Sequence, residues 1–239
     1  VIKARAYGHC FDAALKGLAS TDGFALLDIQ DAAWLREHGW KGRILLLEGF
    51  FHENELSLAE ELACDLVVHC EAQVEWLERF KAKNHKPFNV FLKMNTGMNR
   101  LGFKPERYRA AWTRLSALPQ VEDITLMTHF SDADGAIGVG KQLALFQQTT
   151  QDLAGERSVC NSAAILRALQ SDPLSNQGIT SALIDNSDWV RAGIALYGSS
   201  PDFPDNSASD WGLLPAMSLK ANIISVQAVA AGECVGYGS

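Results

Sequence analysis

The 239-residue sequence contains no apolar run long enough to cross a membrane, and it shows no signal-peptide pattern. It also lacks an excess of positive charge: the net charge is −7 and no basic stripe is present, which argues against nucleic acid. Its five cysteines are odd in number and form no CxxC pair, so we predict reduced thiols and no metal site. We therefore expect a cytoplasmic protein that binds neither nucleic acid nor membranes.

A GxGxxG motif after the first apolar run is also missing, which disfavours an open dinucleotide-binding sheet. Eight short apolar segments alternate with amphipathic ones, and this rhythm predicts βαβ units in an α/β protein, closed into a (β/α)8 TIM-like barrel. The predicted strands are Val1–Ala4, Phe24–Asp28, Ile44–Glu48, Leu66–His69, Val90–Met94, Ile124–His129, Ser158–Cys160 and Trp189–Ile194. The predicted helices are Asp31–His38, Leu56–Ala63, Ala72–Lys83, Pro105–Leu118, Gln142–Leu153 and Ala163–Leu169.

The chain divides into three predicted parts. Residues 1–200 form the barrel, with an irregular polar insertion at Ser171–Asn186. Residues 201–214 are rich in Ser, Asp and Pro and form a linker. Residues 215–239 return to alternating β character and predict the first strands of an incomplete C-terminal β domain. Both ends resemble cut ends, because the chain opens inside a predicted strand, so we expect a fragment of a longer protein.

A lysine follows the first predicted strand. Val1 and Ile2 would deliver Lys3 to a turn, with Tyr7 and Gly8 just beyond it. A lysine at the end of a buried strand is costly as a free cation, but it becomes useful if it forms a Schiff base with an aldehyde cofactor. The alternative is an ordinary surface lysine next to a strand. His9 is interpreted as part of the turn.

Other polar residues follow the remaining predicted strands, and barrels collect function at the carboxyl ends of their strands. These residues are Arg5, Glu48, His69, Lys93, Asn95, Arg100, His129, Asn161, Ser162 and Arg191. Ser162 at a helix start and Gly193 after the last strand favour a phosphate site, since barrels often hold phosphate there. Either could instead be an N-cap or a packing glycine.

Two further pairings follow from charge. Arg191 lies in an apolar run and is expected to point into the barrel, where a buried arginine needs a partner such as His129. Lys93 and Arg100 flank one loop, and two cations at the barrel mouth require an anion. A substrate carboxylate or a modified, negatively charged lysine would serve.

Several blocks resemble bacterial alanine racemases. Val1-Ile-Lys-Ala-Arg-Ala-Tyr-Gly-His9 resembles the lysine signature of that family, usually VVKANAYGHG. Asn95-Thr-Gly-Met-Asn-Arg-Leu-Gly102 resembles its TGMxRxG segment. Further blocks follow in the family's order: Thr128-His-Phe130, Asn161-Ser-Ala163, Arg191-Ala-Gly-Ile-Ala-Leu-Tyr-Gly198 and Val235-Gly-Tyr-Gly238.

The resemblance implies a pyridoxal 5′-phosphate enzyme that interconverts L- and D-alanine and supplies D-alanine for peptidoglycan. It implies a homodimer in which the other subunit completes the active site. Lys3 is then the Schiff-base lysine and the base on the D-alanine face. Arg191 contacts the pyridine nitrogen with His129 behind it, and these three residues are the implied catalytic group.

The same resemblance assigns the binding residues. Tyr7, Ser162 and the backbone of Gly193 and Ile194 hold the cofactor phosphate. Arg100 contacts the substrate carboxylate and the phenolic oxygen of the cofactor. Lys93 is the position that is often carbamylated, which would give Arg100 a negative partner.

The sequence departs from the family pattern at several positions. Arg5 replaces an asparagine; on an alternating strand it would share a face with Lys3, and would then lower the lysine's pKa or compete for phosphate. Cys10 and Ala192 replace a glycine and a proline. The second base of the family, a tyrosine, is expected just beyond Ser239. We therefore expect the complete protein to be a racemase and this stretch alone to be a poor one.

Three alternatives stay open. The first is a non-catalytic pyridoxal phosphate carrier built from a lone barrel. The second is an amino-acid decarboxylase of the same fold, which would favour an acidic partner for the pyridine nitrogen rather than Arg191. The third is a defective product whose barrel binds nothing, an interpretation that Arg5 supports.

Overall fold

The computed structural model describes residues 1–82, 86–169 and 182–237. Its centre is a six-stranded parallel sheet in the sequential order β1-β2-β3-β4-β5-β6. The strands are β1 (Gly23–Leu26), β2 (Arg43–Leu46), β3 (Asp65–Val68), β4 (Phe88–Lys93), β5 (Val121–Met127) and β6 (Arg157–Ser158). The helices are α1 (Lys3–Tyr7), α2 (Phe11–Gly17), α3 (Ile29–Glu37), α4 (Glu55–Glu61), α5 (Glu71–Arg79), α6 (Pro105–Ser116), α7 (Gly140–Thr150), α8 (Ser162–Leu169) and η1 (Ile194–Tyr197), a 3-10 turn.

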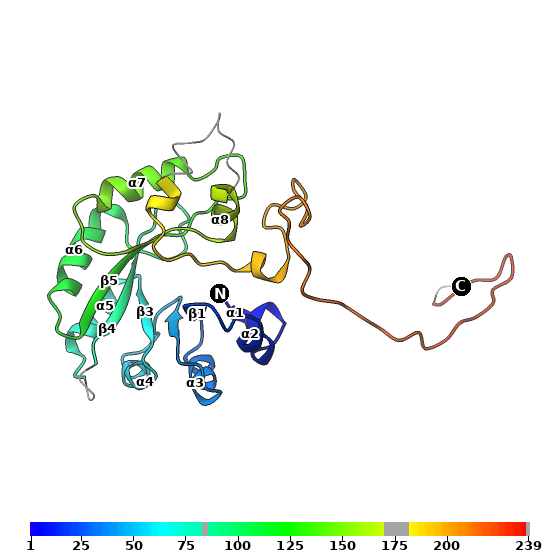
Figure 1. Cartoon of the computed structure of the whole chain (residues 1–239), viewed down its shortest axis with the longest axis horizontal. Coiled ribbons are helices and arrows are strands. Elements are labelled where there is room, and N and C mark those ends of the chain that lie inside the picture. The colour runs from blue at the N-terminus through cyan, green and yellow to red at the C-terminus, as the bar shows by residue number, and fades with distance from the viewer. Residues whose placement is uncertain (83–85, 170–181, 238–239) are drawn as a thin grey trace.

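Helices follow the strands one by one and cover the outside of the sheet (Figure 1). This is the pattern of consecutive βαβ units, which the alternation in the sequence predicted. The strand segments are buried on both faces, as in β3, where all residues from Asp65 to Val68 are buried. Near-continuous apolar character is therefore the correct signal for these strands.

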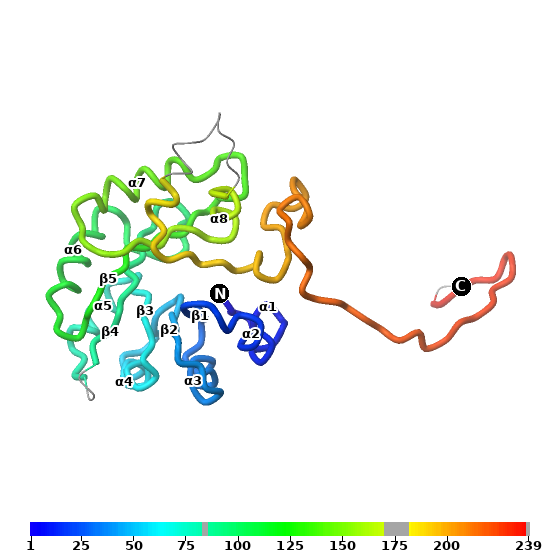
Figure 2. Tube along the Cα trace, in the orientation of Figure 1, coloured from blue at the N-terminus to red at the C-terminus, as the bar shows by residue number. Residues whose placement is uncertain are grey.

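The first and the last predicted strands are not regular strands, yet their backbones close the sheet. Trp189 N–H donates to Arg157 O at 3.1 Å, and Arg191 N–H donates to Cys160 O at 3.0 Å, so this segment lies beside β6. Val1 N in turn donates to Ala192 O at 2.7 Å, and Ile2 N–H donates to Ala25 O of β1 at 2.8 Å. The N-terminus accordingly lies between β1 and the segment before η1 (Figure 2). The predicted ring is present, but Val1–Ala4 and Trp189–Ile194 take part in it through a few hydrogen bonds only.

The prediction of a strand at Val1–Ala4 fails because the backbone turns left-handed there. Ala4, Arg5, Ala6 and Tyr7 have φ angles of 51°, 51°, 56° and 53°. A left-handed helical conformation costs L-residues about 1–2 kcal/mol each, so the turn stores roughly 4–8 kcal/mol that the surroundings must offset. We call residues 3–8 the left-handed turn; it ends at Gly8, whose φ of 89° suits glycine.

The predicted helices correspond to α3 through α8, with ends that differ by a few residues. The predicted helix Ala72–Lys83 is shorter in the structure, since α5 ends at Arg79, and Lys83 lies outside the described residues. Helix α2 was not predicted, because Phe11–Gly17 is short and follows directly on the turn. Of the predicted insertion Ser171–Asn186, residues 171–181 lie outside the described part, and residues 182–185 form a helical turn.

Two apolar clusters hold the barrel together. The larger one lies between the sheet and the outer helices and includes Leu26, Leu46 and Leu66. The smaller one fills the inside of the ring and consists of Ala25, Leu45, Val67, Phe91 and Met127, with Val1, Leu47 and Trp189 packed against it. The inner cluster matters for function because the next inward-facing residues along each strand lie directly above it.

Residues 213–230 carry neither helix nor strand (Figure 1). Most of their side chains are exposed. The predicted division into a barrel at 1–200, a linker at 201–214 and a β domain from residue 215 stays a prediction. Within the described residues no helix is both long and apolar enough to span a lipid bilayer.

Candidate active site

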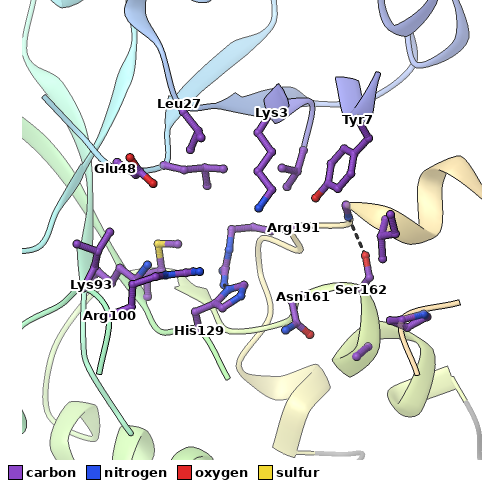
Figure 3. A pocket seen from close by; sticks show the side chains of 18 of the residues that line it. Lys3, Tyr7, Leu27, Glu48, Lys93, Arg100, His129, Asn161, Ser162 and Arg191 are labelled. Carbon is purple, nitrogen blue, oxygen red and sulfur yellow. Dashed lines mark hydrogen bonds between the residues drawn. The ribbon is translucent and has the colours of Figure 1, made fainter. Parts of the chain in front are cut away.

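Four basic or imidazole side chains lie at one level of the barrel. Lys93, His129, Arg191 and Lys3 each come two residues after a residue in or against the inner cluster: Phe91, Met127, Trp189 and Val1. Lys93 ends β4 and continues the inward face of that strand, whereas the other three lie just past or outside the regular strands. They surround one cavity together with Tyr7, Arg100 and Ser162 (Figure 3).

The cavity has a volume of about 260 Å³, close to the lower end of the range of ~300–1,000 Å³ for small-ligand pockets. Its cationic side chains are Lys3, Lys93, Arg100 and Arg191, and its carboxylates are Glu48 and Asp134. The remaining lining includes Leu27, Leu47, Leu101, Met127, His129, Asn161, Ala163, Gly193, Ile194 and Pro201. An excess of cations in a partly enclosed space favours a ligand with negative charge.

Arg191 is fully buried, and its guanidinium is held by neutral acceptors. Nη1 donates to Ser158 O at 2.7 Å and to Ser158 Oγ at 2.5 Å, and Nη2 donates to Thr128 O at 2.7 Å. Nη2 also lies 3.4 Å from His129 Nδ1, so the predicted contact between Arg191 and His129 is present. Among the described residues no carboxylate forms an ion pair with Arg191. Burial lowers its pKa to about 10, so it remains a cation at neutral pH.

Burial, together with the neighbouring cations, sets the protonation of His129. Burial lowers the pKa of His129 to about 3, and the charges of Arg191, Lys93, Arg100 and Lys3 add to this effect. The imidazole is therefore neutral at physiological pH and accepts from Arg191 through Nδ1. A neutral histidine is the form that can hold a buried arginine in a fixed orientation.

Lys93 is also affected by burial and by its neighbours. Desolvation, Arg191 and Arg100 lower the pKa of Lys93 to about 8, while Glu48 opposes the shift. A substantial fraction of this amine is thus unprotonated near neutral pH, which is the form that reacts with carbon dioxide. Lys93 lies at the end of β4, and Arg100 reaches the same cavity from the following loop.

The loop that carries Arg100 is organised by one asparagine. Asn95 Oδ1 accepts from the N–H groups of Gly97 and Asn99, both at 3.0 Å, and Asn95 Nδ2 donates to Asn99 Oδ1 at 3.0 Å. The loop closes where Phe103 N–H donates to Lys93 O at 2.9 Å. Gly102 allows this closure, because a Cβ there would lie 2.7 Å from Asn95 N.

At the other side of the cavity the last segment of the ring meets α8. Ser162 Oγ accepts from Gly193 N–H at 2.8 Å and from Ala195 N–H at 3.4 Å (Figure 3). Tyr7 Oη occupies the space beside Gly193, because a Cβ on that glycine would lie only 2.6 Å from it. Burial raises the pKa of Tyr7, so its hydroxyl keeps its proton and can donate. Tyr7, Ser162 and Gly193 thus form a small polar corner that we call the hydroxyl corner.

The left-handed turn joins Lys3 to the hydroxyl corner. Lys3 Nζ lies 5.8 Å from the centre of the Tyr7 ring, and both side chains line the cavity. Arg5 does not: it lines a separate surface depression with Phe11, Asp31 and Trp34. The prediction that Arg5 shares a face with Lys3 is therefore wrong, because the backbone between them coils instead of alternating.

The structure thus brings to one cavity all the site residues that the family resemblance implies: Lys3, Tyr7, Lys93, Arg100, His129, Ser162, Arg191, Gly193 and Ile194. One carboxylate of the lining, Asp134, was missed, and another, Glu48, was predicted at a strand end without a role. Glu48 was noted only for its place after a strand, and Asp134 lies in a loop where the sequence carries no comparable signal. His69 lies outside the cavity lining, and its Nε2 bonds to Glu48 O at 3.1 Å.

Comparisons with known proteins agree on one family. Residues 1–201 match the family model described as alanine racemase, N-terminal domain. The alanine racemase of Polaromonas sp. is 54% identical over the whole chain, which covers 62% of that protein. The crystal structure of biosynthetic alanine racemase from Pseudomonas aeruginosa superposes with a TM-score of 0.84 at 41% identity, covering 99% of this chain and 62% of that one.

A histidine racemase from Leuconostoc mesenteroides is also similar in structure, with a TM-score of 0.80 at 28% identity over 99% of this chain and 62% of that one. The chain therefore spans a little over three fifths of the length of these relatives. A matched family model over most of the chain, together with high identity along all of it, decides the classification. The chain belongs to the alanine racemase N-terminal domain family.

Proposed function

We propose that this chain is the cofactor-binding barrel of an alanine racemase, and that it holds pyridoxal 5′-phosphate covalently at Lys3. The observation that carries the proposal is the convergence of four kinds of group on one cationic cavity. They are the Lys3 amine, the hydroxyl groups of Tyr7 and Ser162, the guanidinium groups of Arg100 and Arg191, and Gly193, which has no room for a side chain. A phosphorylated aldehyde needs these groups: an amine for its carbonyl carbon and donors for its phosphate.

The hydroxyl corner fits the phosphate. Tyr7 and Ser162 offer hydroxyl groups, and Gly193 and Ile194 offer backbone beside them. Lys3 lies next to this corner because the left-handed turn places it there. Arg191 would contact the pyridine nitrogen, and its guanidinium is already held in place by Ser158, Thr128 and His129.

Bound pyridoxal phosphate supplies the electron sink that stabilises a carbanion at Cα of an amino acid. The protein would move the proton: once the substrate amine has displaced Lys3 from the aldehyde carbon, the freed Lys3 Nζ would take the proton from Cα on one face and return it. Arg191 stays protonated and cannot give its proton to the pyridine nitrogen. The pyridine ring would therefore withdraw electrons less strongly beside Arg191 than beside a carboxylic acid, and we propose that this limits transamination.

Arg100 is proposed to bind the substrate carboxylate, and Lys93 is proposed to become a carbamate. The carbamate forms when the unprotonated amine adds to carbon dioxide and releases a proton, and the negative product would then face Arg100. The pKa of about 8 for Lys93 supports this step, because the amine is partly unprotonated near neutral pH.

Alanine as substrate rests on the curated relatives, which are named alanine racemases at more than half identity. The architecture alone does not select the amino acid, since a histidine racemase shares it. We further propose that the complete protein is a cytoplasmic homodimer, in which the partner subunit completes the site, and that it supplies D-alanine to the cell wall.

Hydrogen exchange tests the proposal. In D2O with pyridoxal phosphate, the 239-residue chain is expected to exchange the Cα hydrogen of D-alanine faster than free cofactor does, and faster than that of L-alanine, because Lys3 acts on one face. The Lys3→Ala variant should match free cofactor. Equal exchange by wild type and Lys3→Ala would contradict the proposal, and efficient racemisation by this stretch alone would contradict the expectation of a second base elsewhere.

The same samples separate the alternatives. A pyridoxal phosphate carrier would bind the cofactor at Lys3 but would give no exchange above free cofactor. A decarboxylase would release carbon dioxide from the amino acid, and Arg191 in place of an acidic partner argues against it. A defective barrel would not bind the cofactor.

A further inference from the structure

One tyrosine of η1 contacts both ends of the left-handed turn. The Tyr197 ring lies 5.0 Å from the Tyr7 ring, centre to centre, at 36°. The His9 imidazole stacks on the Tyr197 ring at 4.7 Å and 21°. Tyr197 Oη also donates to Val1 O at 3.2 Å. Tyr197 is therefore bound to the residues before Lys3 and to those after it.

The left-handed turn needs an external constraint. Four successive residues hold a left-handed backbone that L-residues rarely adopt, and backbone hydrogen bonds inside the turn would form equally well in a right-handed coil. Constraint must come from outside the turn, and Tyr197 supplies it although it is separated from Val1 by 196 positions in the chain. The same segment carries Arg191 and Gly193, so Tyr197 ties the turn to the side of the barrel that they form.

Tyr7 links Tyr197 to the cavity. The Tyr7 hydroxyl fills the gap beside Gly193, and its ring is held in place by Tyr197. Lys3 begins the same turn, and its Nζ lies near the Tyr7 ring. A shift of Tyr197 would therefore move the hydroxyl and the amine together.

We propose that Tyr197, with His9 stacked on it, is a positioning residue that holds the left-handed turn so that Lys3 and the Tyr7 hydroxyl meet a phosphorylated aldehyde at the same time. The inference rests on the proposed function. It adds two residues that do not line the cavity, Tyr197 and His9, and it assigns them a measurable effect: the preference of the site for pyridoxal phosphate over pyridoxal.

The test compares Tyr197→Leu, which removes the ring contacts, with Tyr197→Phe, which keeps the ring and removes the bond to Val1. The affinity of the 239-residue chain for pyridoxal phosphate and for pyridoxal is measured by absorbance titration, and attachment at Lys3 is checked by borohydride reduction and peptide mapping. In Tyr197→Leu the preference for the phosphorylated form should fall about tenfold, the order expected when one hydrogen bond to a charged group is lost. Tyr197→Phe should retain most of the preference.

Tyr108→Phe is the matched control. Tyr108 is a buried tyrosine on α6 whose hydroxyl donates to Leu92 O at 2.8 Å, away from the cavity lining. Its loss should lower stability but leave the preference unchanged. His9→Leu is the second variant should Tyr197→Leu fail to fold, and it is expected to lower the preference to a smaller extent.

The outcomes are distinguishable. If the wild-type chain binds no pyridoxal phosphate, the proposed function fails and this inference fails with it. If the wild type binds, and Tyr197→Leu and His9→Leu keep the full preference for the phosphorylated form, the positioning role alone is refuted. A loss of preference in Tyr108→Phe of the same size would also refute it, because a general loss of stability would then explain the effect.

Discussion

Replacing Gly193 with alanine should weaken cofactor binding through one atom, the Tyr7 hydroxyl oxygen. A Cβ at position 193 would lie 2.6 Å from Tyr7 Oη, closer than the 3.0 Å below which real Cβ contacts are essentially never found. The next contacts are ordinary or only tight, at 3.4 Å to Tyr7 Cζ and 3.8 Å to Ser162 Oγ. The hydroxyl must therefore retreat from the corner where the phosphate is proposed to bind.

The size of the effect follows from the bond that is lost. A hydrogen bond to a charged group contributes about 1.5–3 kcal/mol, which corresponds to roughly a ten- to hundredfold weaker affinity for pyridoxal phosphate. Tyr7→Phe should cost about the same, because it deletes the same hydroxyl. The double variant should then bind nearly as well as either single one, since the oxygen that collides with the new methyl group is already gone.

The assay is a titration with pyridoxal phosphate, followed by absorbance. It is applied to the wild type, the two single variants and the double variant, which together form a double-mutant cycle. Gly17→Ala is the control: Gly17 ends α2, and a Cβ there would meet nothing within 4 Å. It should leave the affinity unchanged. The reasoning is refuted if Gly193→Ala binds like the wild type, or if Gly193→Ala costs as much in the Tyr7→Phe background as it does alone.

Three further predictions concern charge and backbone. The pKa of His129 is lowered from 6.5 to about 3 on folding, so the unfolded chain takes up this proton at a higher pH than the folded one, and the free energy of unfolding falls as the pH drops below 6.5. Between pH 6.5 and pH 5 the free energy of unfolding, measured by urea denaturation, should fall by up to ~2 kcal/mol more in the wild type than in His129→Gln. Equal losses in the two proteins would contradict the assignment. Arg5→Asn should stabilise the chain by about 0.5–1 kcal/mol, since asparagine tolerates the left-handed backbone at residue 5 better than arginine, whereas the β-branched valine of Arg5→Val should destabilise it. Thermal melts of the two variants measure the sign of each effect, and a valine variant more stable than the wild type would contradict the argument. Arg191→Glu should raise the ratio of transamination to hydrogen exchange on alanine, because an acid can hold a proton at the pyridine nitrogen; an unchanged ratio of pyruvate formed to deuterium incorporated would speak against it.

The sequence predicted which side chains share one cavity better than it predicted the backbone around them. Lys93, His129 and Arg191 were predicted from their place at or near the carboxyl ends of near-continuous apolar segments, and the structure places all three in one cavity. This signal can be read locally, because strands buried on both faces are apolar along most of their length.

The left-handed turn could not be predicted in the same way. Val1 and Ile2 are apolar and β-branched, so local propensity favours a continued strand through Ala4. The coil at residues 4–7 is held by contacts with Tyr197 and with β1, which lie far away in the sequence. The misplacement of Arg5 follows from this error, because its predicted face assumed a strand.

The hydroxyl corner was predicted in part. Ser162 and Gly193 carry recognisable signals, a hydroxyl at a helix start and a glycine after a strand. The reason why position 193 must be glycine lies in the tertiary structure, because a Cβ there would collide with Tyr7 Oη. The sequence does not show that these two residues are neighbours. The presence of the Glu48 and Asp134 carboxylates in the cavity also depends on tertiary structure, because loops bring them there.

The most direct test of this account is to locate the cofactor on the chain. The 239-residue protein is incubated with pyridoxal phosphate, reduced with borohydride and digested, and the modified peptide is identified by mass spectrometry, with Lys3→Ala and Lys93→Ala treated in parallel. The account predicts that the pyridoxyl group is found on Lys3, that it disappears in Lys3→Ala and that it persists in Lys93→Ala. Labelling spread over surface lysines, or labelling that survives unchanged in Lys3→Ala, would contradict it.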